Sequence, residues 1–141
     1  MMSTINNVAE TVNMKVIFST FWIFTILNYL YCDIEGLMDP KLLKQYMTGN
    51  LSGIQITQGF LLGAAILMEI PIAMVLLSRI LTYRANRWAN IIAGAVMTVV
   101  QIATLLKRVP TSYYAFFSIQ EIACTMFIVW CAWKMKNLEV N

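Results

Sequence analysis

A long apolar run with one acidic residue at its centre constrains this chain more than any other feature. Residues 59–77 contain a single ionisable side chain, that of Glu69. A helix needs about 20 apolar residues to span a bilayer, and a charged side chain at the bilayer centre costs about 2.5–3.5 kcal/mol. Carboxylates at this depth usually face a bundle interior, find a partner and serve a function. The run therefore predicts a spanning helix in which Glu69 has a role.

The composition extends this prediction to the whole chain. Of the 141 residues, 60% are hydrophobic and only 12% are charged, whereas about 25% of the residues of a soluble domain are charged. The mean hydropathy is +0.69. We therefore expect one all-α membrane domain over residues 1–141, folded as a bundle of four transmembrane helices. The expected spans are residues 16–37, 54–81, 88–106 and 114–133.

The connection between the first two spans carries its own helix signals. Asp39 is a favourable N-cap residue, and Pro40 is favourable at the first helical position. Residues 41–47 then combine apolar side chains with two lysines and a glutamine. This mixture predicts a short interfacial helix in the first loop.

Basic residues at the span ends indicate the orientation, because cytoplasmic loops carry an excess of Lys and Arg. The end of the bundle that holds both termini has the larger set: Lys15, Arg79, Arg84, Arg87, Lys134 and Lys136. The opposite end has Lys41, Lys44, Lys107 and Arg108. The difference is small and favours cytoplasmic termini, with the inverted orientation as the alternative. Tryptophans that lie toward span ends resemble interfacial anchors: Trp22, Trp88, Trp130 and Trp133.

Polar residues in all four spans fall at similar depth. When the alternating helix directions are included, Asn28, Gln101 and Glu121 are displaced from the span centres toward the first loop. At about 1.5 Å per residue, these groups and Glu69 fall within roughly 5 Å of each other in depth. Each of these residues also belongs to a polar stripe on its helix, so we expect them to converge on the bundle axis. The alternative is that they only supply hydrogen bonds between helices.

The two glutamates have no evident counter-ion at this depth, because the basic residues lie near span ends. We expect at least one of them to be protonated at neutral pH. They could share and exchange a proton, or a cationic ligand could supply the missing charge. Pro71 removes one helical hydrogen bond beside Glu69 and predicts a kink.

An acidic mouth is expected on the first-loop side of this layer. Asp33 and Glu35 lie there, with Gln58 below them, and nearby tyrosines offer aromatic faces for a cation. The alternative is that these are ordinary loop residues. The chain has no histidine, which removes the commonest metal ligand and the usual proton shuttle near neutral pH. We therefore expect no metal, no cofactor and no catalytic group.

Several segments resemble those of a known family. They are WIFTILNYLYCDIEGLMDP at residues 22–40, LMEIPIAMVLLSRIL at 67–81 and NRWANIIAG at 86–94, joined by YYAFF at 113–117 and by Glu121. The chain resembles a domain-of-unknown-function family of small bacterial four-helix membrane proteins, and more distantly the DoxX-like group. The resemblance covers nearly the whole chain. It implies four spans and a bacterial inner membrane, and it implies no reaction.

Three functions remain open from the sequence. The first is a bundle that binds or transports a proton or a small cationic or amphiphilic ligand, with Glu69 and Glu121 binding it and Asn28 and Gln101 orienting it. The second is a non-catalytic accessory or assembly subunit. The third is a membrane enzyme that transfers protons on a lipid or isoprenoid. Besides the bilayer, expected partners are a second copy or another membrane protein, and no nucleic acid is expected.

Overall fold

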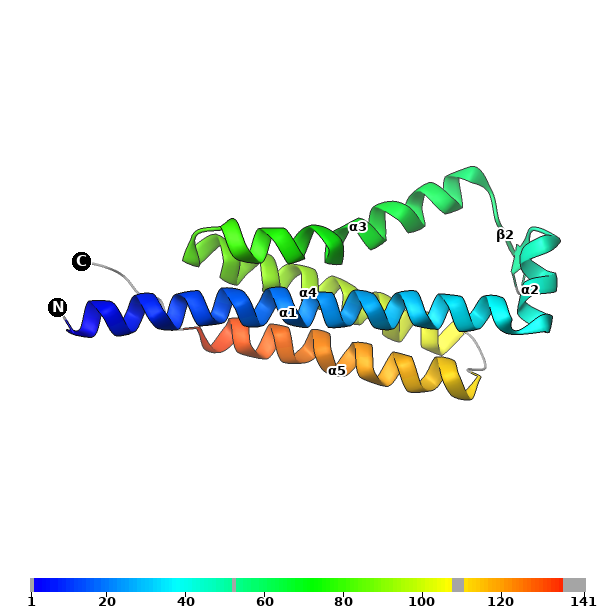
Figure 1. Ribbon diagram of the computed structural model, residues 1–141. Coiled ribbons are helices and arrows are strands. Elements are labelled where there is room, and N and C mark those ends of the chain that lie inside the picture. Colours follow the sequence, from blue (N-terminus) through cyan, green and yellow to red (C-terminus); the bar gives the residue numbers. More distant parts are fainter. Residues whose placement is uncertain (1, 52, 108–110, 136–141) are drawn as a thin grey trace.

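The computed structural model describes residues 2–51, 53–107 and 111–135, with side chains from Asn13 onward. The fold is all-α, as predicted, apart from one small hairpin (Figure 1). Its elements, in chain order, are α1 Met2–Met38, α2 Pro40–Met47, β1 Asn50–Leu51, β2 Ile54–Gln55, α3 Gln58–Ile80, α4 Tyr83–Lys107 and α5 Ser112–Lys134.

Four helices are long and apolar enough to cross a membrane, which confirms the predicted bundle architecture. The candidate spans are Asn13–Met38, Gln58–Ile80, Tyr83–Lys107 and Ser112–Lys134. The second helix begins later than expected because Ile54 and Gln55 pair with Leu51 and Asn50 in the hairpin. Thr57 then caps α3, its side-chain oxygen accepting a hydrogen bond from the Phe60 amide at 3.1 Å. The length and apolar composition of the four candidate spans indicate a membrane protein.

The first loop folds back on the end of α1. Asp39 caps α2 by accepting from the backbone amides of Lys41 and Leu42, with Pro40 at the start of the helix, as predicted. The lack of a side chain at Gly36 allows α2 to pack closely against α1, because a Cβ there would lie 3.3 Å from Cδ2 of Leu42. α2 presents both apolar and basic side chains, so it suits a membrane–water interface.

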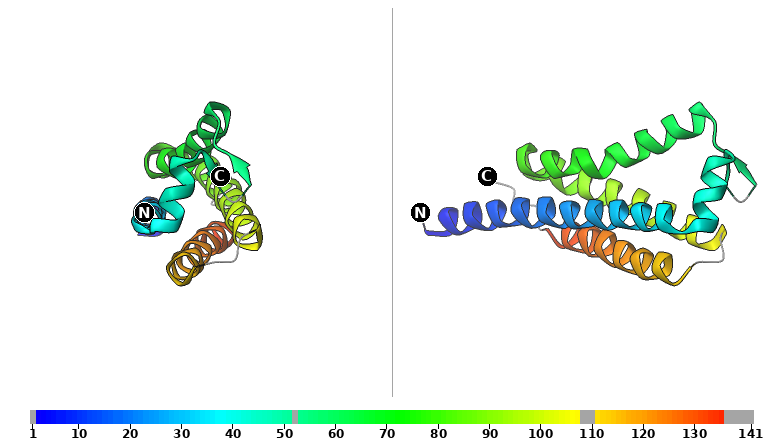
Figure 2. Two further views of the ribbon diagram at one scale, coloured as in Figure 1. Left: turned by 90° about the vertical axis from the view of Figure 1, so that its right-hand side faces the viewer. Right: turned by 45° about the vertical axis from the view of Figure 1, so that its right-hand side comes forward.

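The helices form an up-and-down bundle in which α1 packs against α3 and α5, and α4 packs against α5 and α3 (Figures 1 and 2). The core is dense at the end that holds both termini, where Phe18, Trp22, Met97 and Ile128 are fully buried. α4 and α5 share the most extensive contact. Gly94 makes this possible, because a Cβ there would lie only 2.7 Å from Cγ2 of Val129.

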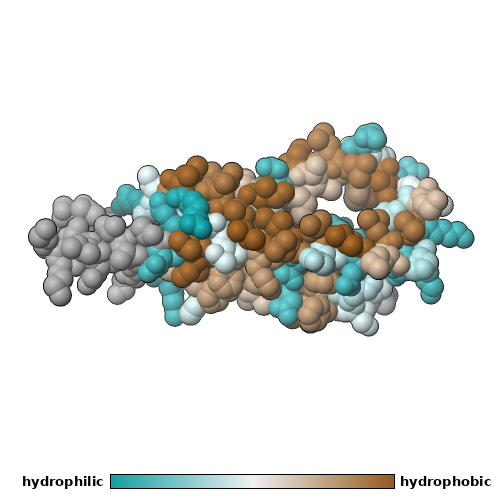
Figure 3. All heavy atoms as spheres, in the orientation of Figure 1, coloured by the Kyte–Doolittle hydropathy of each residue, from teal (hydrophilic) through white to brown (hydrophobic). Residues whose placement is uncertain are grey.

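The first half of α3 leaves the bundle. Pro71 lies inside this helix and is itself buried, and it removes the hydrogen bond to the Leu67 carbonyl. Beyond it, Met74 and Ser78 are buried in the bundle, whereas residues 57–66 are all exposed. Figures 1 and 2 show α3 bending away, and the space-filling view in Figure 3 shows an opening beneath its first half.

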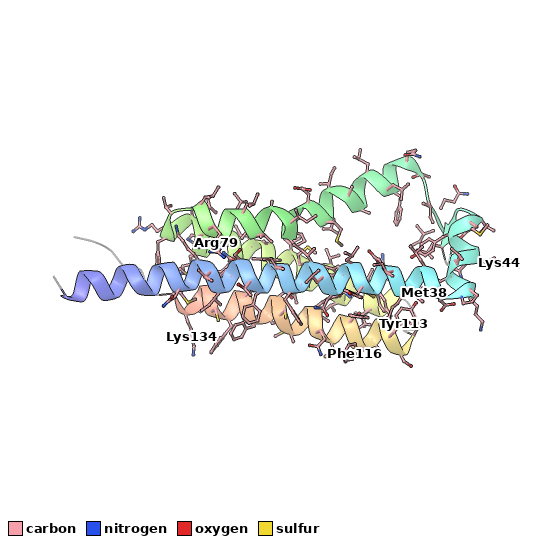
Figure 4. All side chains as sticks on the ribbon, in the orientation of Figure 1. Met38, Lys44, Arg79, Tyr113, Phe116 and Lys134 are labelled. Carbon is pink, nitrogen blue, oxygen red and sulfur yellow. The ribbon has the colours of Figure 1, made fainter. Side chains whose placement is uncertain are left out.

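Basic residues gather at the two ends of the bundle, as the sequence indicated. Arg79 and Lys134 lie at the end that holds the termini, and Lys44 lies at the opposite end (Figure 4). Arg108 and Lys136, which also entered the orientation prediction, lie outside the described residues.

Candidate functional site

Glu121 is the carboxyl group that the structure encloses. It lies on α5, only 1% of its surface is exposed, and it ranks among the largest fully buried side chains. Neither Oε1 nor Oε2 has a hydrogen-bond partner among the described residues. A buried polar group without a partner costs about 1–3 kcal/mol, and more when it is charged. Such a group in a native interior requires an explanation.

The surroundings of Glu121 come mainly from α1. Tyr29 and Cys32 of this helix are buried near its carboxyl group. The Tyr29 hydroxyl is also buried with no hydrogen-bond partner among the described residues. The charged neighbour of Glu121 is Asp33, which is also acidic. The site is therefore acidic. Its buried carboxylate and hydroxyl oxygens lack hydrogen-bond partners among the described residues, and the ring of Tyr29 lies beside it.

Polar contacts between α4 and α5 lie on both sides of Glu121. Gln101 is buried, and its Nε2 donates to the Ser118 hydroxyl at 2.9 Å. The Thr98 hydroxyl donates to that of Thr125 at 2.7 Å, and Thr125 donates to the Glu121 backbone carbonyl at 2.9 Å. These bonds fix the backbone that presents Glu121. They leave its carboxyl group unused.

The predicted interior position of Glu69 is wrong. Glu69 is the central residue of the 23-residue helix α3, but its side chain is exposed. Its carboxylate makes no hydrogen bond or ion pair with any residue that the structure describes. The reason is that Leu67, Met68 and Ile70 take the inward positions against the core. Glu69 and Glu121 therefore do not form a pair.

Asn28 also stays outside the predicted layer. It is half-buried, and its Nδ2 donates to the Phe24 carbonyl of its own helix at 2.8 Å. Of the four residues expected on the bundle axis, the structure buries Glu121 and Gln101 only.

The expected mouth is assembled only in part. Asp33 is exposed beside the Glu121 site and Glu35 is half-buried on the same helix. Gln58 is exposed at the start of the divergent half of α3, and no described contact joins it to either acid. The predicted kink residue, Pro71, lies inside α3, and Figure 1 shows that this helix bends.

A second polar cluster, which the sequence analysis missed, joins α1, α3 and α4 nearer the termini. Trp22 is fully buried, and its Nε1 donates to Oδ1 of Asn90 at 2.8 Å. Nδ2 of Asn90 donates to Oδ1 of Asn86 at 2.7 Å, and Nδ2 of Asn86 donates to the Ser78 carbonyl at 3.1 Å. Trp22 is therefore a core residue and no interfacial anchor. The signal was the Asn86–Asn90 spacing, which places two amides on one helix face.

The two polar clusters differ in what they can do. In the asparagine cluster, the amides meet donors and acceptors from neighbouring helices, as expected of groups that hold helices together. Glu121 lacks such partners and carries a titratable group. Its site can accept a proton, or it can accept a cation that replaces the hydration lost on burial.

These features define a class: a four-span membrane protein that encloses a carboxyl group without a hydrogen-bond partner among the described residues. The chain belongs to the Family of unknown function (DUF6326), whose sequence model matches residues 7–140. This confirms the resemblance to an uncharacterised family. No curated protein and no solved structure matches the chain, and the resemblance to the DoxX-like group stays a prediction.

Proposed function

We propose that the protein binds a small cationic or amphiphilic ligand, or a proton in its place, at Glu121, and that it carries this species across or within the membrane. The observation that supports the proposal is the burial of both carboxylate oxygens with no partner among the described residues. A cation would offset the charge of Glu121, which Asp33 cannot do. The ring of Tyr29 adds an aromatic surface of the kind that attracts cations.

The divergence of α3 supports a route from the bilayer. Its exposed first half leaves α1, α4 and α5 without a fourth helix on the first-loop side, and Figure 3 shows the opening there. An amphiphile could enter through this opening with its apolar part still in lipid. The bend at Pro71 gives α3 a point about which its first half can close.

The experiment compares two isosteric variants, Glu121→Gln and Glu69→Gln. Each removes one carboxylate from the middle of a span, but only the first changes the enclosed site. The probe is tetraphenylphosphonium, a lipophilic cation, and binding to the purified protein in mild detergent is measured by calorimetry between pH 6 and 9. Triphenylphosphine oxide, which is neutral, serves as the control ligand.

Wild-type protein should bind the cation more weakly as the pH falls, because protons compete for the carboxylate. Glu121→Gln should lower the affinity at least about thirtyfold, since removing one partner of a desolvated charge pair costs about 2 kcal/mol or more. It should also remove the pH dependence. Glu69→Gln should change the affinity less than about threefold. Equal cation binding by wild type and Glu121→Gln would refute the proposal.

A second candidate function, an assembly subunit, rests on Glu69. A carboxyl group at mid-span on an exposed surface costs about 2.5–3.5 kcal/mol in lipid, and a partner helix would relieve this cost. The exposed half of α3 also contains Gly59 and Gly63, spaced as in small-residue helix contacts. The partner would be a second copy of the chain or another membrane protein.

Native mass spectrometry of wild type and Glu69→Leu tests this candidate without reference to ligand binding. If Glu69 mediates assembly, the wild type should be oligomeric and the variant monomeric. A wild type that stays monomeric and purifies alone removes this candidate, whatever Glu121 binds.

We also propose the membrane in which the protein lies and its orientation there. A bacterial inner membrane with both termini in the cytoplasm fits the family resemblance and the larger basic set at the terminal end. Single cysteines at Arg84 and at Lys44, in a chain without its native cysteines, would report the orientation. An impermeant maleimide added to intact cells should label the Lys44 position and leave the Arg84 position unlabelled.

A further inference from the structure

Two buried side chains from different helices meet at the Glu121 site without bonding to each other. Glu121 on α5 is 1% exposed, and Tyr29 on α1 is 8% exposed. Tyr29 lies near the Glu121 carboxyl group. Nevertheless, both carboxylate oxygens and the phenol oxygen lack a hydrogen-bond partner among the described residues. A ligand that joined the two side chains would therefore meet three oxygens that are free to form hydrogen bonds.

The polar side chains around this site bond elsewhere. Nε2 of Gln101 donates to the Ser118 hydroxyl at 2.9 Å. The Thr125 hydroxyl donates to the backbone carbonyl of Glu121 at 2.9 Å and does not reach the carboxylate. Asp33, the charged neighbour of Glu121, only accepts hydrogen bonds when it is ionised. Among the described residues, none of these side chains donates to the Glu121 carboxylate, so a bound molecule would have to supply the donors.

Hydrogen-bond chemistry narrows the kind of cation that suits three such oxygens. An ionised carboxylate accepts hydrogen bonds only, and a phenol oxygen can accept them as well. A primary ammonium group combines a positive charge with three N–H donors, one for each oxygen. A quaternary ammonium group has the charge but no donor. A metal ion fits less well, because the described residues contain no group of three His, Cys, Asp or Glu side chains that could hold one.

On the basis of the proposed function, we propose that the site selects protonated primary amines with an apolar tail. The ammonium group donates to both carboxylate oxygens of Glu121 and to the hydroxyl oxygen of Tyr29. An ammonium group is compact, which suits a carboxyl group that is 1% exposed. The tail remains in the bilayer on the first-loop side, where residues 57–66 of α3 are all exposed and Figure 3 shows an opening.

Calorimetry with two matched ligands tests this selectivity on the purified full chain in mild detergent. Decylammonium and decyltrimethylammonium have the same chain, and both are cations at about pH 8.5, since alkylammonium groups titrate near the lysine value of about 10.4. Tyr29→Phe removes the buried hydroxyl and keeps the ring. Tyr31→Phe makes the same change at a 58% exposed position of the same helix. Glu121→Gln removes the charge that both ligands need.

Wild type should bind decylammonium at least about tenfold more tightly than decyltrimethylammonium, because a hydrogen bond to a charged group contributes about tenfold or more. Tyr29→Phe should reduce this preference at least about fivefold, because it removes one of the three acceptors. Tyr31→Phe should keep the wild-type preference. Glu121→Gln should weaken the binding of both ligands.

The outcomes separate the selectivity from the proposed function. If wild type binds the two cations equally and Glu121→Gln weakens both, the proposed function stands and the selectivity for primary amines is refuted. A preference that persists in Tyr29→Phe also refutes it, because the smaller size of the ammonium group would then explain the preference. If neither cation binds, or if Glu121→Gln binds both as wild type does, both proposals fail.

Discussion

Gly94→Ala would measure how closely α4 and α5 must approach. A Cβ at this position would lie 2.7 Å from Cγ2 of Val129 and 3.2 Å from the Thr125 carbonyl oxygen. Val129 is β-branched and has one strongly preferred rotamer in a helix, so α5 itself must shift. Overpacking costs about 1–3 kcal/mol, while alanine's higher helix propensity contributes about 1 kcal/mol. We expect a net loss of about 0–2 kcal/mol in the free energy of unfolding, whereas the same substitution at a glycine in open space should gain about 1 kcal/mol.

The assay is thermal unfolding of the purified protein in mild detergent, followed by circular dichroism. Each kcal/mol corresponds to a midpoint shift of about 2–8 °C, so the overpacking cost of about 1–3 kcal/mol is measurable against a control glycine variant. Gly63→Ala is the matched control, because nothing lies within 4 Å of a Cβ there. In the Gly94→Ala background, Val129→Ala should lower the free energy of unfolding less than it does in the wild type. The reason is that it removes Cγ2 of Val129, the atom closest to the new Cβ. Equal midpoints for the two glycine variants would refute the packing argument.

Three further outcomes are expected in the same assay. Asn90→Leu should lower stability by about 1–3 kcal/mol, because it leaves the buried Trp22 donor unpaired, whereas Asn28→Leu should cost less than about 0.5 kcal/mol, as surface changes usually do. Glu121→Met should raise the melting midpoint and abolish cation binding, since it removes a buried group without partners; a lower midpoint would contradict this. Asp39→Ala should cost about 1 kcal/mol locally, seen as faster amide exchange in α2 with an unchanged midpoint.

Local chemistry made much of the fold predictable. The four spans follow from long apolar runs, and α2 follows from the cap at Asp39 and the proline after it. The burial of Glu121 and Gln101 follows from the polar stripes on their helices. In each case the informative residues are close together in the sequence, so no knowledge of the neighbouring helices was needed.

Glu69 and Trp22 were misplaced because their environment depends on distant residues. Residues 59–77 of α3 are apolar on every side except at Glu69, so periodicity alone does not say which face turns inward. The packing of Leu67, Met68 and Ile70 decides this. Trp22 meets its acceptor 68 residues further along the chain. The position of a tryptophan along its span does not say whether it lies at the membrane surface or is hydrogen-bonded in the core.

The bend in α3 also divides the molecule mechanically. Past Pro71 the helix is clamped, with the Val75 carbonyl bonded to Ser19 at 3.0 Å and Ser78 fully buried. Before Leu67 the helix forms an arm in which residues 57–66 are all exposed. Under a pulling force applied at the first loop, this arm would peel away first and at low force. The clamped ends of α1, α3 and α4 would separate later, in a distinct step.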